Sequence, residues 1–136
     1  MFRATLIGMN NEIVLIAEHA ATIIEPQAWT STTWTIRADR KVIINIRYNM
    51  NDAKERDIET TIAQDVFDEI FDTLELAKRE DRKIFVFDGE EWSFKQYQAG
   101  TQIYRRRAAA IDGLMEFEKL SEVLYRVIKR ARPAGE

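Results

Sequence analysis

The sequence predicts an α+β fold: an antiparallel β-sheet of about six to seven strands in hairpins and a meander, with two amphipathic helices packed on one face. Period-two alternation of apolar and polar residues, clearest over 41–48, predicts strands with one buried face. Apolar stripes at helical spacing over 61–79 and 112–130 predict two helices with one buried side each. These one-sided elements bury their apolar surfaces together in the order strands, helix, strands, helix.

The 136-residue chain has the size of one domain, and we expect a single α+β domain over 1–132 followed by a frayed C-terminal tail over 133–136. Its 46% hydrophobic and 32% charged residues give it the apolar content that disordered chains lack. Because the net charge is only −3, no overall electrostatic attraction favours nucleic acid or an anionic membrane, and we expect neither as a partner.

The absence of cysteine excludes disulfides, thiolate metal sites and cysteine nucleophiles, and it is typical of a reducing compartment. Near the N-terminus, the polar pair Asn10-Asn11 and the charges of Arg3 and Glu12 interrupt the apolar residues. This interruption fits neither a signal peptide nor a membrane span. We therefore expect a cytoplasmic protein.

The first predicted element is a hairpin formed by the short apolar segments 2–8 and 12–17 around Asn10-Asn11, because asparagine tolerates the left-handed backbone of a tight turn. A helix over 12–24 is the alternative. It would place Ile13, Ala17 and Ala20 on one side, with Ile24 one turn further on.

The next predicted strands are 29–37 and 41–48, joined by the polar turn 38–40. In the second strand one set of alternate side chains is apolar and the other mostly polar, as in a sheet with one buried face. The buried set is Val42, Ile44, Ile46 and Tyr48. The polar segment 49–59 is predicted as a loop with a short edge strand at its end.

The first predicted helix begins with a capping box formed by Thr61 and Gln64 and ends near Lys78-Arg79, where positive charge suits the helix dipole. Its apolar stripe consists of Ile62, Val66, Phe67, Ile70, Phe71 and Leu74. Acidic residues fill its opposite side, which is typical of a helix with one solvated face.

A second group of strands follows, over 83–87, 91–97 and a third segment ending near Arg105. Asp88-Gly89 and Ala99-Gly100 are predicted to form the two turns between them. Asp112 is then predicted to cap the final helix, whose stripe consists of Leu114, Phe117, Leu120, Leu124, Val127 and Ile128.

No motif predicts catalysis, a cofactor or a metal ion. We expect no cofactor and no metal, and an enzyme is possible but has no support in the sequence. His19 is the only histidine, and its sequence neighbours supply no partner for acid-base chemistry, so we interpret it as an ordinary strand-end or loop residue. Asp88, Glu90 and Glu91 could bind a hard cation. We prefer the interpretation of Asp88 as a turn former and of the glutamates as solvated charges, because the spacing lacks the pattern of a calcium loop.

Two charged segments are the candidate partner-binding surfaces. Arg105, Arg106 and Arg107 place three guanidinium groups in a row at the end of a predicted strand. The helix acids Asp65, Asp68 and Asp72 carry the opposite charge, so the two surfaces could bind another protein or join two copies head to tail. Solvated surface charge is the alternative interpretation of each.

The strand aromatics Trp29, Trp34, Trp92 and Phe94 are interpreted as core residues, with the lining of a ligand pocket as the alternative. The segment Phe87-Asp88-Gly89-Glu90-Glu91-Trp92-Ser93-Phe94, followed by a hairpin and an amphipathic helix, resembles a pattern in small bacterial α+β proteins. Some of those proteins are presumed toxin-immunity proteins. The resemblance covers at most the last third of the chain and implies no functional residue.

Two hypotheses about function follow from these observations. The first is a small, non-catalytic protein-interaction module, as the resemblance to immunity proteins also implies. The second is a small-ligand-binding protein or an enzyme with a pocket between the sheet and the helices.

Overall fold

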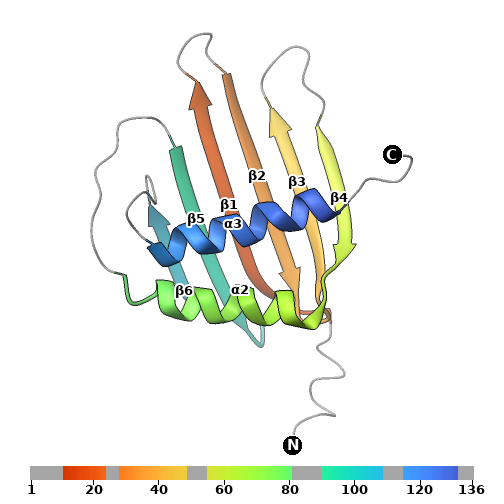
Figure 1. Ribbon diagram of the computed structural model, residues 1–136, viewed down its shortest axis with the longest axis vertical. Helices are drawn as coiled ribbons and strands as arrows, with labels where there is room; N and C mark the ends of the chain where they lie inside the picture. Colours follow the sequence, from red (N-terminus) through yellow and green to blue (C-terminus); the bar gives the residue numbers. More distant parts are fainter. Residues whose placement is uncertain (1–10, 24–27, 49–54, 81–89, 109–114, 132–136) are drawn as a thin grey trace, which may run out of the picture.

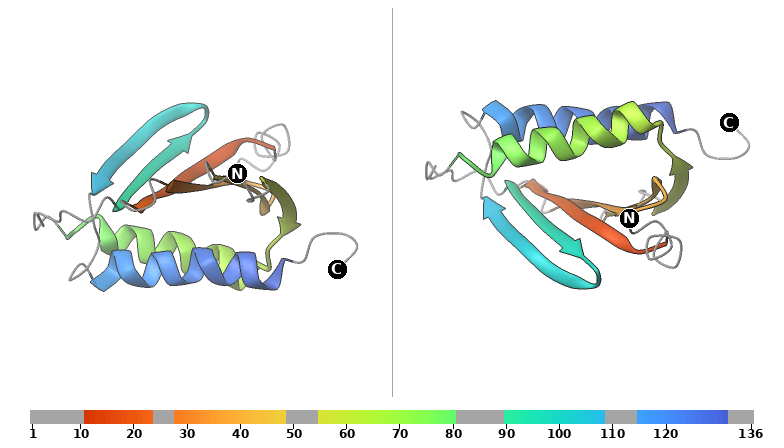
Figure 2. Two further views of the ribbon diagram at one scale, coloured as in Figure 1. Left: turned by 90° about the horizontal axis from the view of Figure 1, so that it is seen from above. Right: turned by 90° about the horizontal axis from the view of Figure 1, so that it is seen from below.

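The computed structural model describes residues 11–23, 28–48, 55–80, 90–108 and 115–131. These residues form two layers, a six-stranded antiparallel sheet and a pair of helices that cover one of its faces (Figures 1 and 2). The predicted fold class and element order are confirmed. The sheet order is β4-β3-β2-β1-β5-β6, and its strands are β1 (Ile13–Ile23), β2 (Ala28–Arg37), β3 (Lys41–Tyr48), β4 (Arg56–Thr61), β5 (Glu90–Gln98) and β6 (Thr101–Ala108).

The central strand β1 contradicts the helical alternative for 12–24. Leu15 and Ala17 are buried at every second position, and both edges of the strand are hydrogen-bonded, to β2 on one side and β5 on the other. This pairing stabilises the extended conformation against the helical one that the spacing also allowed. The other half of the predicted hairpin, 2–8, lies outside the described residues.

Strands β2 and β3 confirm the best-defined hairpin of the sequence. Val42, Ile44 and Ile46 are buried on one face of β3, as predicted, while the side chain of Tyr48 lies outside the described residues. In the turn between the strands, the carboxylate of Asp39 accepts hydrogen bonds from the Arg37 side chain and the Lys41 amide. Burial opposes ionisation there, but these bonds outweigh it and lower the pKa of Asp39.

The short edge strand predicted at the end of 49–59 is confirmed: β4 begins at Arg56 and continues through Thr61, two residues beyond the predicted segment. Ile58 is its one large buried apolar residue and lies opposite Ile44 of β3. With charged neighbours on both sides, a single apolar residue gives too little alternation to mark where the strand ends.

Helix α2 (Gln64–Ala77) begins later than predicted, and the capping box is wrong. Thr61 is still part of β4, and the N-cap residue is Ala63, which makes no side-chain capping bond. The Gln64 amide instead donates to Asp68 one turn further along the helix, at 2.9 Å. The helix ends at Ala77 with Lys78 as its C-cap, in agreement with the predicted end.

The hairpin of β5 and β6 turns at Ala99-Gly100, as predicted. Both residues have positive φ, 52° and 78°, the backbone of a type I′ turn, which matches the twist of the flanking strands. The predicted strand 83–87 and the Asp88-Gly89 turn lie outside the described residues. The two neighbours of β5 in the sheet are β1 and β6.

We expect replacement of Ala99 by glycine to stabilise the protein by about 0.5–1 kcal/mol, because a left-handed alanine costs more than the extra chain entropy of glycine. The matched control is Gly100→Ala. A Cβ at position 100 would meet no atom within 4 Å, so its expected loss of about 1 kcal/mol is purely conformational. Urea unfolding measures both, and a destabilised Ala99→Gly variant would contradict the left-handed turn.

Helix α3 (Met115–Arg130) receives its cap from a residue far away in the sequence. The Glu80 carboxylate, just beyond α2, accepts hydrogen bonds from the backbone amides of Glu116 at 3.0 Å and Phe117 at 3.1 Å. These amides have no acceptor within the helix, and a carboxylate is their preferred partner. The predicted cap, Asp112, lies outside the described residues.

The core between the layers is built around aromatic side chains from the sheet and α3. Trp34, Trp92 and Phe94 are buried there against Phe117, which confirms their interpretation as core residues. The indole nitrogen of Trp34 donates to the Leu124 carbonyl at 2.9 Å and so ties the sheet to α3. The side chain of Trp29 lies outside the described residues.

Candidate functional site

The arginine triplet of β6 is divided between the two faces of the sheet. Arg106 lies opposite Phe94, on the face covered by the helices, whereas Arg105 and Arg107 lie opposite Lys95 and Ser93 on the other face. Successive side chains of a strand point to opposite sides. The three guanidinium groups therefore do not form one binding surface.

Arg106 has contacts that explain it structurally. Its guanidinium donates to the backbone carbonyl of Glu80 and lies 5.1 Å from the centre of the Phe117 ring. Burial raises the pKa of the neighbouring Tyr104, an effect that the charge of Arg106 partly offsets. Arg106 thus connects the edge of the sheet to the junction between α2 and α3.

Arg105, Arg107 and Lys95 form a basic patch on the face of the sheet that neither described helix covers. Lys95 lies directly opposite Arg105, where two like charges repel each other. Arg107 pairs with Glu91 at 2.8 Å. Within the described ranges of the chain, Lys95 and Arg105 make no ion pair, so the patch keeps two uncompensated positive charges.

The opposite edge strand, β4, carries acids on the same face. We call Asp57 and Glu59 the acidic edge; they lie opposite Asn45 and Ile43 of β3, away from the helices. Hydrogen bonds from Asn45 and Arg47 lower the pKa of Asp57, so its carboxyl is ionised at neutral pH. Glu59 pairs with Lys41 at 2.9 Å.

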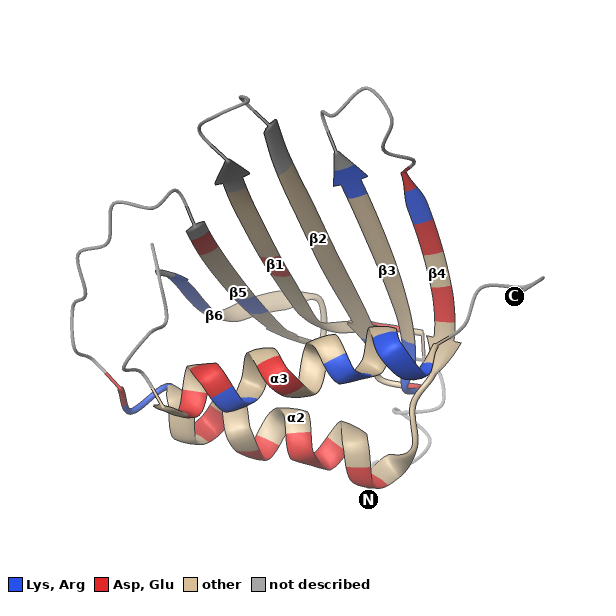
Figure 3. Ribbon diagram, turned by 45° about the horizontal axis from the view of Figure 1, so that its top comes forward, with Lys and Arg blue, Asp and Glu red and all other residues tan. Residues whose placement is uncertain are grey.

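The directions of the two edge strands, β4 and β6, also allow them to pair. All neighbouring strands of the sheet are antiparallel, so β4 and β6 run in opposite directions at its two ends. Among the described residues, no strand pairs with the outer side of either one. Figure 3 shows acids along β4, with a basic segment between them, and basic residues along β6.

The acidic surface predicted on the first helix is present on α2, but it does not lie next to the basic patch. Asp65, Asp68 and Asp72 are exposed on α2, along which Figure 3 shows acids, whereas the basic patch is on the face of the sheet that the helices do not cover. Two charged surfaces of one molecule therefore face in opposite directions. The structure does not bring together the two groups of residues predicted from the sequence.

His19 lies at a contact that its sequence neighbours did not reveal. Its Nδ1 atom is 2.5 Å from the Tyr125 hydroxyl of α3, and its ring stacks on Trp92 with centres 4.2 Å apart. Tyr125 also meets Trp34 edge-on. His19 thereby extends the aromatic core; because Tyr125 is 106 residues away, local sequence gave no signal of this contact.

The acidic cluster predicted near position 88 is only partly described. Glu91 forms an ion pair with Arg107, while Asp88 and the side chain of Glu90 lie outside the described residues. Within the described ranges, no group of three or more histidine, aspartate or glutamate residues is arranged to hold a metal ion. Neither α2 nor α3, the two helices described, has the length and apolar content to cross a bilayer.

The fold is that of a two-layer α+β protein with a basic patch at one sheet edge. The two acids at the other edge, Asp57 and Glu59, form ion pairs with Arg47 and Lys41 of β3, each at 2.9 Å. No protein-family model matches the chain, and a comparison with curated proteins gives no match either.

Proposed function

We propose that the chain is a non-catalytic protein-interaction module of the cytoplasm that binds an acidic β-strand along the outer edge of β6. The observation that carries this proposal is the uncompensated pair of Lys95 and Arg105, which face each other across β5 and β6. Like charges directly opposite destabilise a sheet, and an acid from a partner relieves that cost.

Backbone pairing supplies the second part of the interaction. An edge strand presents unpaired N–H and C=O groups to which an extended segment can add. Antiparallel addition along β6 would place every second side chain of the partner on the same face as Arg105 and Arg107. Acids at those positions would form cross-strand ion pairs with the basic patch.

A second copy of this chain is the partner that fits this description. Its β4 runs antiparallel to β6 when two sheets are placed edge to edge, and the acidic edge of Asp57 and Glu59 then lies on the same face as the basic patch. Pairing β6 with β6, or β4 with β4, would bring like charges together. Charge thus favours a head-to-tail contact between unlike edges.

Sedimentation velocity tests this contact from about 10 µM to about 1 mM protein, which covers association free energies of about −7 to −4 kcal/mol. We expect the wild-type sedimentation coefficient to rise with concentration. The Arg105→Glu/Arg107→Glu variant should stay monomeric, with Arg106 left intact because it supports the fold.

The matched control changes the other acidic surface. Asp65→Lys/Asp68→Lys on α2 should associate like the wild type, since those residues lie on the helix layer. A wild-type protein that is monomeric throughout the range would overturn the proposal. So would a loss of association in the α2 variant alone.

A further inference from the structure

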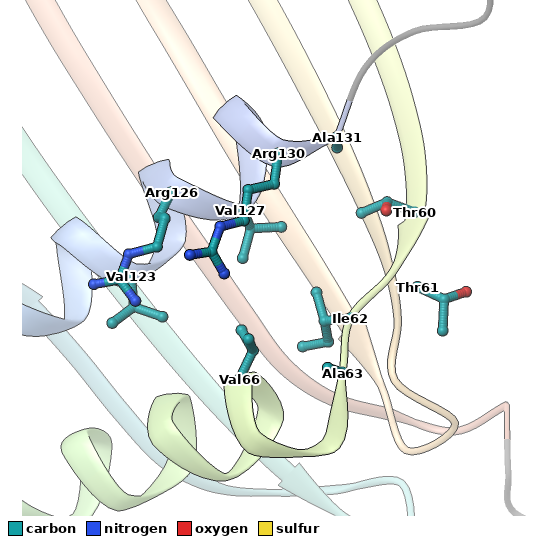
Figure 4. Close-up of a pocket in the computed structure, with 10 residues that line it drawn as sticks. All are labelled: Thr60, Thr61, Ile62, Ala63, Val66, Val123, Arg126, Val127, Arg130 and Ala131. Atoms are coloured by element: carbon teal, nitrogen blue, oxygen red, sulfur yellow. The ribbon is translucent and has the colours of Figure 1, made fainter.

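A pocket of about 220 Å³ lies between α2, α3 and the end of β4 (Figure 4). Its walls are largely apolar, with Ile62 and Val66 on one side and Val123 and Val127 of α3 on the other. At about 30 Å³ per molecule, the volume corresponds to roughly seven waters, or to an organic molecule with a similar number of heavy atoms.

Two arginines of α3 stand at the rim of this pocket. Figure 4 shows the side chains of Arg126 and Arg130 extending on the same side of the helix, with their guanidinium groups toward the pocket. They are four residues apart, a spacing at which like charges repel on a helix. Arg126 has Glu69 at 3.3 Å, whereas Arg130 makes no ion pair within the described part of the chain.

We propose that this pocket binds a small carboxylate with a short aliphatic body, a ligand independent of the interaction along β6. The aliphatic part would be removed from water against the valines and Ile62, which is favourable in proportion to its area. The carboxylate would lie at the rim, where the planar guanidinium of Arg130 can donate two parallel hydrogen bonds to it.

The chemistry of the pocket distinguishes a small carboxylate from other molecules of similar size. An alcohol of the same length gains the apolar contacts but not the charge-assisted bonds, and an alkylammonium is repelled by both arginines. Inorganic phosphate forms the charge-assisted hydrogen bonds but leaves the apolar walls of the pocket in contact with water. Only a molecule with both parts uses the whole site.

Sodium hexanoate, 1-hexanol, hexylammonium chloride and sodium phosphate are the probes, titrated into the full chain and followed by amide chemical shifts. For so small a ligand we expect a dissociation constant of about 1 mM for hexanoate. Binding of hexanol should be about tenfold weaker, since a charge-assisted hydrogen bond contributes that factor or more. The shifts should centre on α2, α3 and the end of β4.

Variants separate the two parts of the site. Arg130→Gln should weaken hexanoate about tenfold and leave hexanol unchanged, while Val127→Phe, which fills the pocket, should abolish the binding of both. Arg105→Gln, on the far face of the sheet, is the matched control and should bind like the wild type.

Three results would overturn the carboxylate site: hexanol binding as tightly as hexanoate, phosphate binding as tightly as hexanoate, or hexanoate shifts that avoid α2 and α3. None of these depends on whether two copies associate, because hexanoate can also be titrated into Arg105→Glu/Arg107→Glu, which should stay monomeric and keeps every residue of the pocket.

Discussion

Replacement of Trp34 by alanine should lower the free energy of unfolding by about 3–5 kcal/mol, one of the largest effects of any single substitution in the described core. The side chain is fully buried between the sheet and α3 and stacks near Trp92, with ring centres 5.9 Å apart. Its removal leaves a cavity and also breaks the bond to the Leu124 carbonyl. Urea denaturation followed by circular dichroism measures the change.

Two further variants separate the causes of this loss. Trp34→Phe keeps most of the buried ring area but not the indole donor, so its loss should be smaller, about 1–3 kcal/mol. Met115→Ala changes a side chain that is 63% exposed, and it should stay within about 0.5 kcal/mol of the wild type. An equal loss in Trp34→Phe and Trp34→Ala would mean that the hydrogen bond, rather than packing, accounts for the effect.

Arg106→Glu should destabilise the protein by about 2–3 kcal/mol, the second large effect. The substitution removes the bond to the Glu80 carbonyl and the contact with the Phe117 ring. It also places a negative charge near the Glu80 carboxylate that caps α3. Chemical denaturation of the single variant measures the loss.

The matched control is the pair of neighbouring arginines. Arg105→Glu/Arg107→Glu should change the free energy of unfolding by less than about 1 kcal/mol, since both side chains are exposed. The new acid at position 105 faces Lys95, and the loss of the exposed Arg107–Glu91 pair costs little. Equal destabilisation by the two variants would contradict the placement of Arg106 and its neighbours on opposite faces of β6.

Local patterns were sufficient for most of the fold. Alternation over 41–48 predicted β3 because its buried and exposed residues are chemically distinct, and Ala99-Gly100 predicted the β5–β6 turn from backbone preference alone. Of the stripe predicted for the last helix, Phe117, Leu120, Leu124 and Val127 are buried, Ile128 is half-buried, and Leu114 lies outside the described residues. These elements depend on residues that are close together in the sequence.

Features that depend on distant contacts were not predicted. The capping box at Thr61 failed because pairing with β3 extends β4 through that residue, and Glu80 caps α3 across 36 residues. The contact of His19 with Tyr125 is of the same kind. The division of the arginine triplet could have been predicted, since residues 105–107 continue a predicted strand and adjacent strand residues alternate in face.

The most direct test of the proposed interaction is to mix two charge-reversed variants. Arg105→Glu/Arg107→Glu and Asp57→Lys/Glu59→Lys should each remain monomeric, because both edges of either variant then carry the same charge. Circular dichroism first verifies that both are folded. In an equimolar mixture, unlike edges are available again, and sedimentation velocity should show association restored to about the wild-type level. Two variants that stay monomeric when mixed, at concentrations where the wild type associates, would contradict pairing between β4 and β6.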